Sequence, residues 1–440
     1  MKKRLFRKII GIALIFVMMV SMAVGCSNQV PSESKDKNLK STESTSQEKE
    51  KEKVTISFWH HYNAQSPENK TLNEVIIPAF EEKFPHIKVK AVSHEWAQLH
   101  KKILVSASAN QLPDVARSDI AWVPEFQKLN ILVALDKEMK DFQNVANNIL
   151  EGPMNTAKVK GNYYGLGLNT NTKILFYNKE MFDKAQVAVP KTMDEFFEAA
   201  RKLTKEENGQ KIWGYAEPAL SGWNICPFIW SNGGDITDPE YKVATGYLNS
   251  PETIEIIQKL ADLYKDGAMI GFNKGDIPLT DGYGRGRYAM IIEGPWKFAE
   301  LAGSYPDFKP ETAQMPAGKG GSAQVLGGED IIMFSTANKE AAWEFMKFMT
   351  GEFAQIEMAK VGQIPVNKTA IESDAVKGIK NFAPFLKAIK TAKPRPPVST
   401  WPEIDKELTT AVTLAITGEK PVKAALDDAA KKIDELLKKQ

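Results

Sequence analysis

The chain has 440 residues, of which 43% are hydrophobic and 25% are charged, so it can bury two or more cores and is too apolar for a disordered protein. It carries 57 Lys and Arg against 55 Asp and Glu, a net charge of +2, and five of the positive charges lie in the first eight residues. The remainder has a net charge of −3, which excludes a protein built to bind nucleic acid.

The N-terminus has the pattern of a secretory signal. Its basic residues precede an apolar run over 9–20 and small residues up to Cys26. A transmembrane anchor is the alternative, but about a dozen apolar residues fall short of the ~20 that span a bilayer. The sequence Ala-Val-Gly-Cys over 23–26 resembles a bacterial lipobox. This resemblance implies that 1–25 is a signal peptide and that Cys26 is lipidated and anchors the protein to the membrane.

The segment after Cys26 is predicted to be a tether. Residues 27–53 hold six acidic residues and six Lys and no aromatic residue, so they cannot bury enough surface to fold. We assign 26–53 to the lipidated cysteine and a disordered tether. Cys226 is the one other cysteine, so the exported chain has no internal disulfide and depends on packed cores.

Strand and helix patterns alternate from residue 54 onward. Apolar residues alternate over 54–59 and over 87–92, which predicts two strands with a helical stretch between them. Thr192 and Glu195 form a capping box before a helix, and a last helix begins at Pro421. This alternation predicts an α/β protein with open, mostly parallel sheets, and 387 residues fit two lobes better than one.

Several of the nine Trp lie where a ligand can reach them. Trp59 ends a predicted strand, and Trp296 follows a strand that Gly-Pro interrupts; ligands of open α/β sheets bind outside the carboxyl ends of strands. An indole at that edge suits the flat C–H face of a pyranose ring. Trp223 and Trp230 share one face of a predicted helix, which is either core or cleft, whereas Trp343 lies in a helix whose pattern predicts packing.

Several ordered segments resemble the extracellular solute-binding proteins, family 1, the carbohydrate-binding lipoproteins of ABC importers that include the maltose-binding type. The resemblance covers nearly all of 54–440, and the order and spacing of its segments are specific. These segments are 112–115, 161–169, 176–179, 190–195, 231–234, 289–290, 294–296 and 362–367.

The resemblance implies a two-lobe periplasmic-binding-protein-like fold of type II with a hinge, and no enzyme activity. The chain would cross between the lobes near 169–172, 326–330 and 361–365. It would divide into 54–170 (first lobe), 171–327 (second lobe), 328–362 (return to the first lobe) and 363–440 (second lobe). The expected partners are a sugar or oligosaccharide, the ABC permease subunits and the membrane. A monomer without a cofactor, on the extracytoplasmic face of a bacterial membrane, is expected.

The resemblance also implies a set of residues that face the cleft between the lobes. The maltose-binding type has an aromatic residue two positions after the Glu that matches Glu217, where this chain has Ala219, so maltose is not implied. The cleft residues implied are Trp59, His60, Ser118, Asp119, Asn169, Thr170, Glu217, Trp223, Trp230, Trp296, Gly328, Glu329 and Trp401.

Two other functions stay open at this stage. A secreted carbohydrate-active hydrolase needs a pair of carboxylates, which Asp119, Glu217, Asp235 and Glu329 could supply, although no spacing marks two of them as partners. A two-lobe binder of a metal ion could use a tyrosine pair such as the one at 163–164. The five His show no spacing typical of a metal site, so no metal is expected.

Overall fold

The computed structural model describes residues 52–335 and 338–440, all within one unit of the chain, Lys51–Gln440. The predicted signal peptide over 1–25, Cys26 and nearly all of the predicted tether over 26–53 lie outside the described residues. Among the described residues, no helix has both the length and the apolar character needed to cross a membrane.

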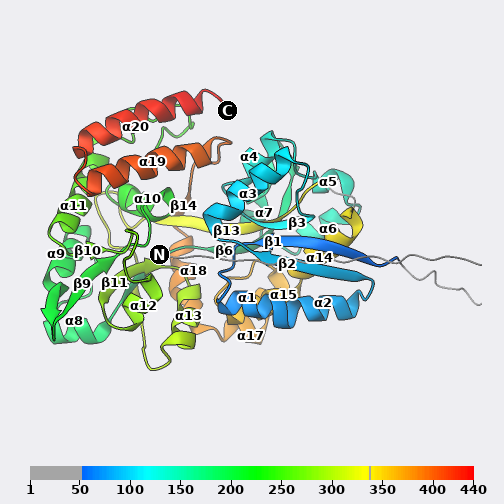
Figure 1. Cartoon of the computed structure of the whole chain (residues 1–440), viewed down its shortest axis with the longest axis horizontal. Helices are drawn as coiled ribbons and strands as arrows, with labels where there is room; N and C mark the ends of the chain where they lie inside the picture. The colour runs from blue at the N-terminus through cyan, green and yellow to red at the C-terminus, as the bar shows by residue number, and fades with distance from the viewer. Residues whose placement is uncertain (1–51, 336–337) are drawn as a thin grey trace, which may run out of the picture. The chain divides into compact units, whose positions relative to one another are not determined.

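The first lobe is built on a six-stranded sheet (Figure 1, right). Strand β1 lies between β2 and β3 and is parallel to both, while β13 is antiparallel to β3 and to β6. The strands are β1 (Val54–His60), β2 (Ile87–Ser93), β3 (Val115–Asp119), β6 (Gly165–Asn171) and β13 (Gln324–Met333), and β14 (Ala392–Pro394), from the segment predicted for the second lobe, pairs with the first residues of β13.

Helices cover both faces of this sheet because its strands alternate apolar residues between the two faces. Val115 and Ile331 pack against α2, α14 and α15, whereas their neighbours Ala116 and Ile332 pack against α3 and α4. The elements of this lobe are α1 (Pro67–Thr71), η1 (Leu72–Ile76), α2 (Ile77–Lys83), α3 (Trp96–Ser108), α4 (Val123–Lys128), α5 (Leu135–Glu138), α6 (Phe142–Ala146), α7 (Glu151–Thr156), β4 (Lys158–Val159), β5 (Asn162–Tyr163), α14 (Lys339–Met349) and α15 (Glu352–Lys360).

The second lobe has its own six-stranded sheet (Figure 1, left). Met290 and Ile292 pack on one face against α9, α10, α11, α19 and α20, and Ile291 packs on the other against α12, α13 and α18. The strands are β7 (Ile174–Tyr177), β8 (Lys205–Glu207), β9 (Gln210–Ala216), β10 (Met269–Ile270), β11 (Tyr288–Glu293) and β12 (Glu311–Ala313).

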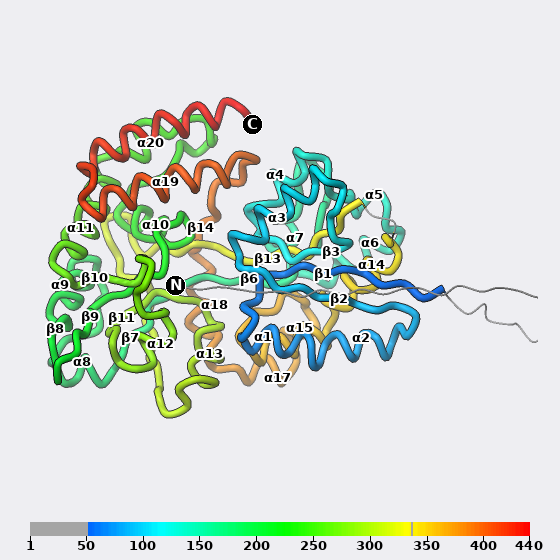
Figure 2. Tube along the Cα trace, viewed as in Figure 1, coloured from blue at the N-terminus to red at the C-terminus, as the bar shows by residue number. Residues whose placement is uncertain are grey.

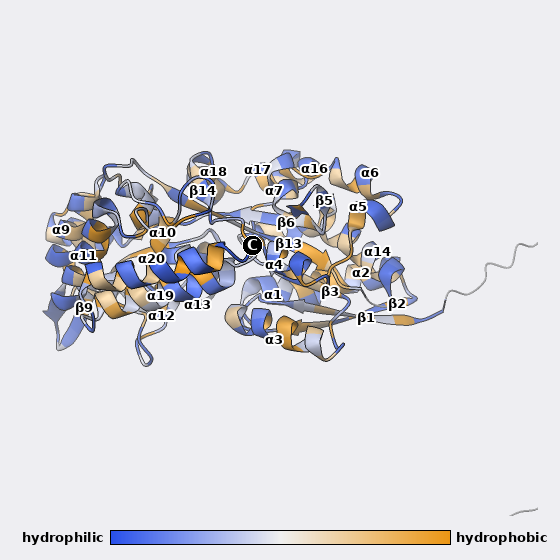
Figure 3. Cartoon of the chain, turned by 90° about the horizontal axis from the view of Figure 1, so that it is seen from above, coloured by the Kyte–Doolittle hydropathy of each residue, from blue (hydrophilic) through white to orange (hydrophobic). Residues whose placement is uncertain are grey.

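The helices of the second lobe show hydrophilic and hydrophobic residues in alternation along their length (Figure 3), as helices with one face on a sheet do. They are α8 (Lys179–Ala185), α9 (Met193–Leu203), α10 (Gly222–Ser231), α11 (Pro251–Lys265), α12 (Leu279–Gly284), α13 (Trp296–Ser304), α18 (Ala383–Ile389), α19 (Trp401–Ile416) and α20 (Val422–Leu437). Three short elements precede α18: α16 (Lys368–Glu372), α17 (Asp374–Lys377) and η2 (Lys380–Phe382).

The predicted strand pairing needs correction, because both sheets are mixed. In the described part of the second sheet, β9 is parallel to β10 and β11, but β7 is antiparallel to β11 and β12, and β8 is antiparallel to β9. In the first sheet, β6 and β13 run in opposite directions because one carries the chain out of the lobe and the other brings it back. The prediction of two open α/β sheets with flanking helices is confirmed.

The three predicted hinge segments lie side by side. Gly328 on β13 pairs with Thr170 on β6, and the Thr170 N–H donates to the carbonyl of Ile364 at 3.1 Å. Figure 2 shows β13 beside β6 between the two lobes. Gly328 has φ +148°, and a Cβ there would lie 2.5 Å from the Asn169 carbonyl oxygen, so this close approach requires glycine. The lobe boundaries at 170/171, 327/328 and 362/363 stay a prediction.

Local signals in the sequence are confirmed at several helix ends. Thr192 and Glu195 form the predicted capping box of α9, and α20 follows Pro421. Gly233 ends α10 at φ +92°, as predicted for the Asn-Gly-Gly after it. Trp343 is a core residue of α14, and Cys226 is buried and free.

Candidate functional site

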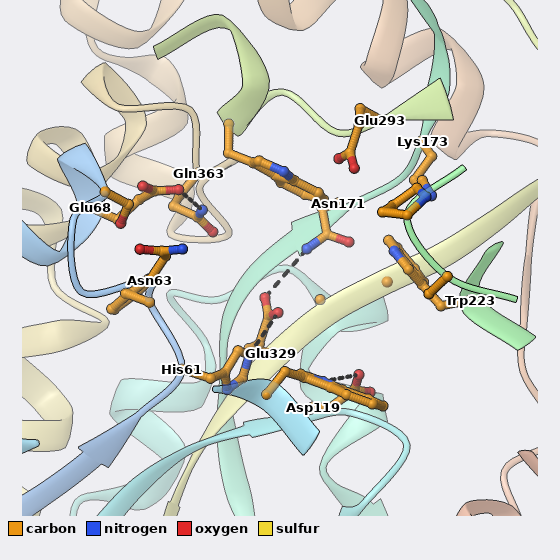
Figure 4. A pocket seen from close by; sticks show the side chains of 18 of the residues that line it. His61, Asn63, Glu68, Asp119, Asn171, Lys173, Trp223, Glu293, Glu329 and Gln363 are labelled. Atoms are coloured by element: carbon orange, nitrogen blue, oxygen red, sulfur yellow. Dashed lines mark hydrogen bonds and ion pairs between the residues drawn. The ribbon is translucent and has the colours of Figure 1, made fainter. Parts of the chain in front are cut away.

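A cavity of about 510 Å³ lies between the two lobes, at the carboxyl ends of β1, β3, β6 and β11 (Figure 4). Three indoles line it: Trp96 from the first lobe, and Trp223 and Trp296 from the second. The charged side chains that line it are Glu68, Arg117, Asp119, Lys173, Glu293, Glu300, Glu329 and Arg395.

Glu329 is held in the floor of the cavity by donors from three other segments. The Arg117 guanidinium lies 2.8 Å from Oε2, and Asn169 and Asn171 donate to the same oxygen at 2.6 and 3.3 Å. His61, directly after β1, lies 3.4 Å from Oε1. This carboxylate therefore connects β1, β3 and β6 to the hinge strand β13.

The charge on Glu329 persists although the group is buried. Burial alone would raise its pKa, but Arg117 and the hydrogen bonds from His61 and Asn169 bring the pKa down to about 2. Burial and the charge of Arg117 lower the pKa of His61, so this imidazole is neutral at pH 7. Glu329 and Arg117 therefore present one fixed anion and one fixed cation to the cavity.

Asp119, at the end of β3, also accepts hydrogen bonds at both of its carboxylate oxygens. Arg395 donates to its two oxygens at 2.7 and 3.3 Å, the Trp96 indole N–H donates at 3.1 Å, and the Ala121 amide donates at 2.9 Å. The guanidinium carbon of Arg395 lies 5.3 Å from the ring centroid of Trp223 on α10. Arg395 therefore joins a carboxylate of the first lobe to an aromatic wall from the second.

A third buried cation, Lys173, lies directly after the first hinge crossing. Its ammonium donates to Asn224 Oδ1 at 2.8 Å and lies 3.7 Å from Glu217 Oε1. Burial raises the pKa of Glu217 to about 7, although Lys173 and the Tyr215 hydroxyl, which donates to it, act in the opposite direction. Glu217 is completely buried and lies on the side of Lys173 that faces away from the cavity.

Trp296 begins α13 on the second wall of the cavity. Its ring lies over Gly294, where a Cβ would be 2.1 Å from the indole. Gly362, in the third hinge segment, has φ +101°, and a Cβ there would be 2.7 Å from the Trp296 Cα. The backbone of Trp296 is thus packed against the hinge, while its ring lines the cavity.

Five of the thirteen predicted cleft residues line the cavity together, and they come from both lobes: Asp119, Trp223, Trp296, Gly328 and Glu329. Asn169 does not line the cavity; its side-chain amide donates a hydrogen bond to Glu329, which does. Thr170 is a hinge residue whose hydroxyl lies 3.4 Å from the Gly327 carbonyl.

The other predicted residues of the first lobe do not line the cavity. Successive residues of a strand face opposite sides, so Ser118, between Arg117 and Asp119, is buried away from the cavity. Trp59 packs on the side of α3, with its ring against His94 and under Lys102. His60 lies among the rings of Phe58 and Tyr62, and its burial, together with Arg117, lowers its pKa to about 3.

Three predicted residues of the second lobe are core. Trp230 is 3% exposed and donates its indole N–H to Asp235 at 2.8 Å, and Trp401 is 2% exposed in the same hydrophobic cluster. Glu217 is buried behind Lys173, and the residues after it, Pro218 and Ala219, line the cavity instead.

Sequence reasoning missed several lining residues. Arg117 shares the face of Asp119 on β3, and Asn171 shares the face of Asn169 on β6, so strand alternation was a signal for both. Trp96 follows the end of β2, the context that pointed to Trp59 and Trp296. Arg395 lies in a loop after β14, and no pattern in the sequence distinguishes it.

Two α/β lobes joined by a hinge, with a cavity between them, make this the two-lobe fold of the periplasmic binding proteins. The chain belongs to the family of bacterial extracellular solute-binding proteins, whose family model matches residues 76–384. The family places the protein outside the cytoplasm.

Relatives of the chain are binding proteins. A binding protein of Brucella abortus is 27% identical over 384 residues, which cover 83% of this chain and 90% of the relative. The galactooligosaccharide-binding protein of Bacillus subtilis is 24% identical, with 80% and 84% covered. An ABC transporter solute-binding protein of Thermotoga lettingae, solved with α-D-tagatose, is 26% identical, with a TM-score of 0.78 and 87% and 99% covered.

The depressed pKa of Glu329 predicts a pH-dependent stability. Because the carboxyl titrates near 2 when folded and near 4.5 otherwise, its ion pair stabilises the protein above pH 4.5, and the contribution is lost as pH falls toward 2. Glu329→Gln should cost about 3 kcal/mol or more at pH 7, because Arg117 loses its partner. This gap from the unmodified protein should narrow by about 2 kcal/mol at pH 3.

Urea unfolding at pH 7, 4.5 and 3 measures this gap. Glu180→Gln, an exposed carboxylate paired with Lys184, is the matched control and should differ little from the unmodified protein at any of these pH values. A gap for Glu329→Gln that stays constant from pH 7 to pH 3 would contradict the assigned pKa shift.

Proposed function

We propose that the protein is an extracytoplasmic receptor that captures a sugar or oligosaccharide between its lobes and delivers it to an ABC import permease. The observation that carries this proposal is the set of three indoles, Trp96, Trp223 and Trp296, around one cavity with fixed charges in its floor. The likeness to the galactooligosaccharide-binding relative and to the tagatose-bound structure supports the same substrate class.

The chemistry of the cavity suits a polyhydroxylated ring. A pyranose has C–H faces that stack on indoles and hydroxyls around its rim that both donate and accept hydrogen bonds. Fixed carboxylates such as Asp119 and Glu329 accept from hydroxyls, while Arg117, Lys173 and Arg395 donate to them. We propose Asp119, Trp223, Trp296, Gly328 and Glu329 from the sequence prediction as ligand residues, and add Trp96, Arg117, Lys173 and Arg395.

Binding without turnover is part of the proposal. A glycoside hydrolase needs one carboxyl that is protonated near neutral pH beside a second, free carboxylate. Of the carboxylates named for that alternative, Asp119 and Glu329 line the cavity, and both are held in ion pairs. Asp235 accepts from Trp230 in the core, and Glu217 is buried.

The metal-binding alternative has no support at this site. The tyrosine pair on which it relied, at 163–164, does not line the cavity. Tyr163 lies on β5, with its ring 5.3 Å from that of Phe142.

The proposal is tested by a thermal-shift panel of mono- and oligosaccharides on the purified protein. A bound sugar should raise the melting temperature through mass action. Calorimetry then measures its affinity, and chromatography after overnight incubation should return the sugar unchanged. No shift with any sugar would contradict a sugar receptor, and a shortened sugar would favour the hydrolase.

Trp296 is the residue whose loss should affect affinity most directly. Trp296→Ala removes a stacking surface, so we expect a loss of about thirtyfold or more in sugar affinity, as for other aromatic anchors. The melting temperature of the unliganded protein should change little, because the ring lines the cavity and is only partly buried.

Trp213→Ala is the matched control. This indole is also half-buried in the second lobe, but it lies between Lys211 and Arg287, away from the cavity. Its loss should leave sugar affinity unchanged. A Trp296→Ala variant with normal affinity and a melting temperature lower by several degrees would assign Trp296 to the core instead.

We also propose that the protein is a monomeric lipoprotein, held at the membrane through Cys26 after cleavage of 1–25. The family supports an extracytoplasmic location, and the residues around Cys26 resemble a lipobox. A flexible tether over 26–53 would let the lobes, divided at about 170/171, 327/328 and 362/363, stand off from the bilayer.

Replacement of Cys26 tests the anchor. Cys26→Ala should release the protein from membranes or leave an uncleaved precursor, because no acyl chains can be attached. Fractionation and mass spectrometry of the N-terminus measure both outcomes, with Cys226→Ala as the control that keeps normal retention. Normal membrane retention of a cleaved Cys26→Ala variant would refute lipidation at this residue.

A further inference from the structure

The charges of the cavity are matched on one side and unmatched on the other. Arg117 is bound to Glu329, Arg395 to Asp119 and Lys173 to Asn224 and Glu217. Among the described residues, each arginine that lines the floor and the Trp223 wall thus has its own carboxylate, and Lys173 has the carboxyl of Glu217 nearby. At the Trp296 end three carboxylates, Glu68, Glu293 and Glu300, share one ammonium.

That ammonium belongs to Lys297, which is 5% exposed. It lies 2.5 Å from Glu300 Oε2 and donates to the Thr280 hydroxyl at 2.7 Å. Burial alone would lower the pKa of Lys297, but Glu293 and Glu300 hold it above its usual value. One ammonium can compensate only one of the three carboxylates, so this end of the cavity holds more carboxylates than cations among the described residues.

Glu68 and Glu293 reach the cavity from opposite lobes. Glu68 comes from α1 and Glu293 from the end of β11, and α1 also contacts α13, the helix that Trp296 begins. Figure 4 shows the two side chains on opposite sides of the cavity. They are 5% and 7% exposed, so water compensates little of their charge.

Glu68 retains an unused acceptor. Gln363 Nε2 donates to its Oε1 at 3.1 Å, but its Oε2 has no hydrogen-bond partner among the described residues. Burial raises the pKa of this carboxyl, and the nearby Glu300 raises it further. Such a group requires a donor, and a cationic donor compensates its charge as well.

We propose that this end of the cavity is an ammonium subsite, so that the sugar captured carries a free amino group that binds between Glu68 and Glu293 against Trp296. The inference rests on the proposed function and narrows its substrate class to amino sugars. An ammonium there would donate a charge-assisted hydrogen bond to the unused Glu68 oxygen, be attracted by the charge of Glu293 and make a cation–π contact with the indole. A hydroxyl in the same place would not compensate the excess of carboxylates over cations at this end.

The experiment compares matched sugars on the full protein at pH 7 by calorimetry. The probes are glucosamine, galactosamine, mannosamine and β-1,4-linked glucosamine oligomers, each beside its N-acetylated form and its neutral parent. We expect the best amino sugar to bind at least tenfold more tightly than both counterparts. N-acetylation removes the charge and keeps the nitrogen, so it separates an effect of charge from one of position.

Two variants assign the preference to these residues. Glu68→Gln and Glu293→Gln should each reduce the ratio of amino-sugar affinity to neutral-sugar affinity by about tenfold. The test needs only one of these two variants to be stably folded. Glu74→Gln, in the next turn after α1 and exposed to solvent, should keep the ratio of the unmodified protein.

The outcomes separate this inference from the proposed function. If a neutral sugar binds and its amino form binds no better, the ammonium subsite is refuted while the sugar receptor stands. If no sugar of any form binds, both are refuted. If calcium or sodium chloride alone stabilises the protein and Glu68→Gln abolishes that effect, the carboxylates hold a metal ion and the inference is wrong.

Discussion

The buried carboxylate of Glu329 is the point on which the cleft depends. It belongs to β13, accepts hydrogen bonds from Asn169 and Asn171 on β6 and forms an ion pair with Arg117 on β3. It therefore joins side chains of the two central hinge strands to a side chain of β3. A buried charge is tolerated only where donors surround it. The hydrogen bonds and the ion pair of Glu329 therefore hold Asn169, Asn171 and Arg117 in place and also hold the hinge strands β6 and β13 together.

The third hinge segment extends this network to the second lobe. Gln363 lies 3.5 Å from Arg117 and donates to Glu68, while its neighbour Gly362 packs against the backbone of Trp296. On the other side of the cavity, Arg395 joins Asp119 to Trp223. Both aromatic walls of the second lobe are thus connected to a charged group of the first, so a ligand that stacks on either indole also meets charges fixed by the hinge.

The fold could be predicted from the sequence because its signals are local. Alternation over 54–59, the capping box at Thr192 and the Gly-Pro before Trp296 each depend on a few neighbouring residues, and each is present in the structure. Resemblance located the hinge, where Thr170, Gly328 and Ile364 meet. The individual site residues were harder, because a one-residue step along a strand reverses the face, which separates lining Asp119 from buried Ser118. The mixed sheets were missed because strand direction depends on which distant strands become neighbours.

The distribution of charge in the cavity has a consequence for how a ligand is selected. Two ion pairs lie on one side of the cavity: Arg395 with Asp119, and Arg117 with Glu329. A sugar hydroxyl that binds there exchanges its hydrogen bonds with water for hydrogen bonds with these groups, and many neutral sugars can do so. Where Glu68, Glu293 and Glu300 share the single ammonium of Lys297, a ligand that brings a positive charge is favoured over one that does not, and few sugars carry one. The side of the cavity with paired charges therefore favours the class of polyhydroxylated rings. The side with the excess of carboxylates, where our proposal places an amino group against Trp296, distinguishes members within that class.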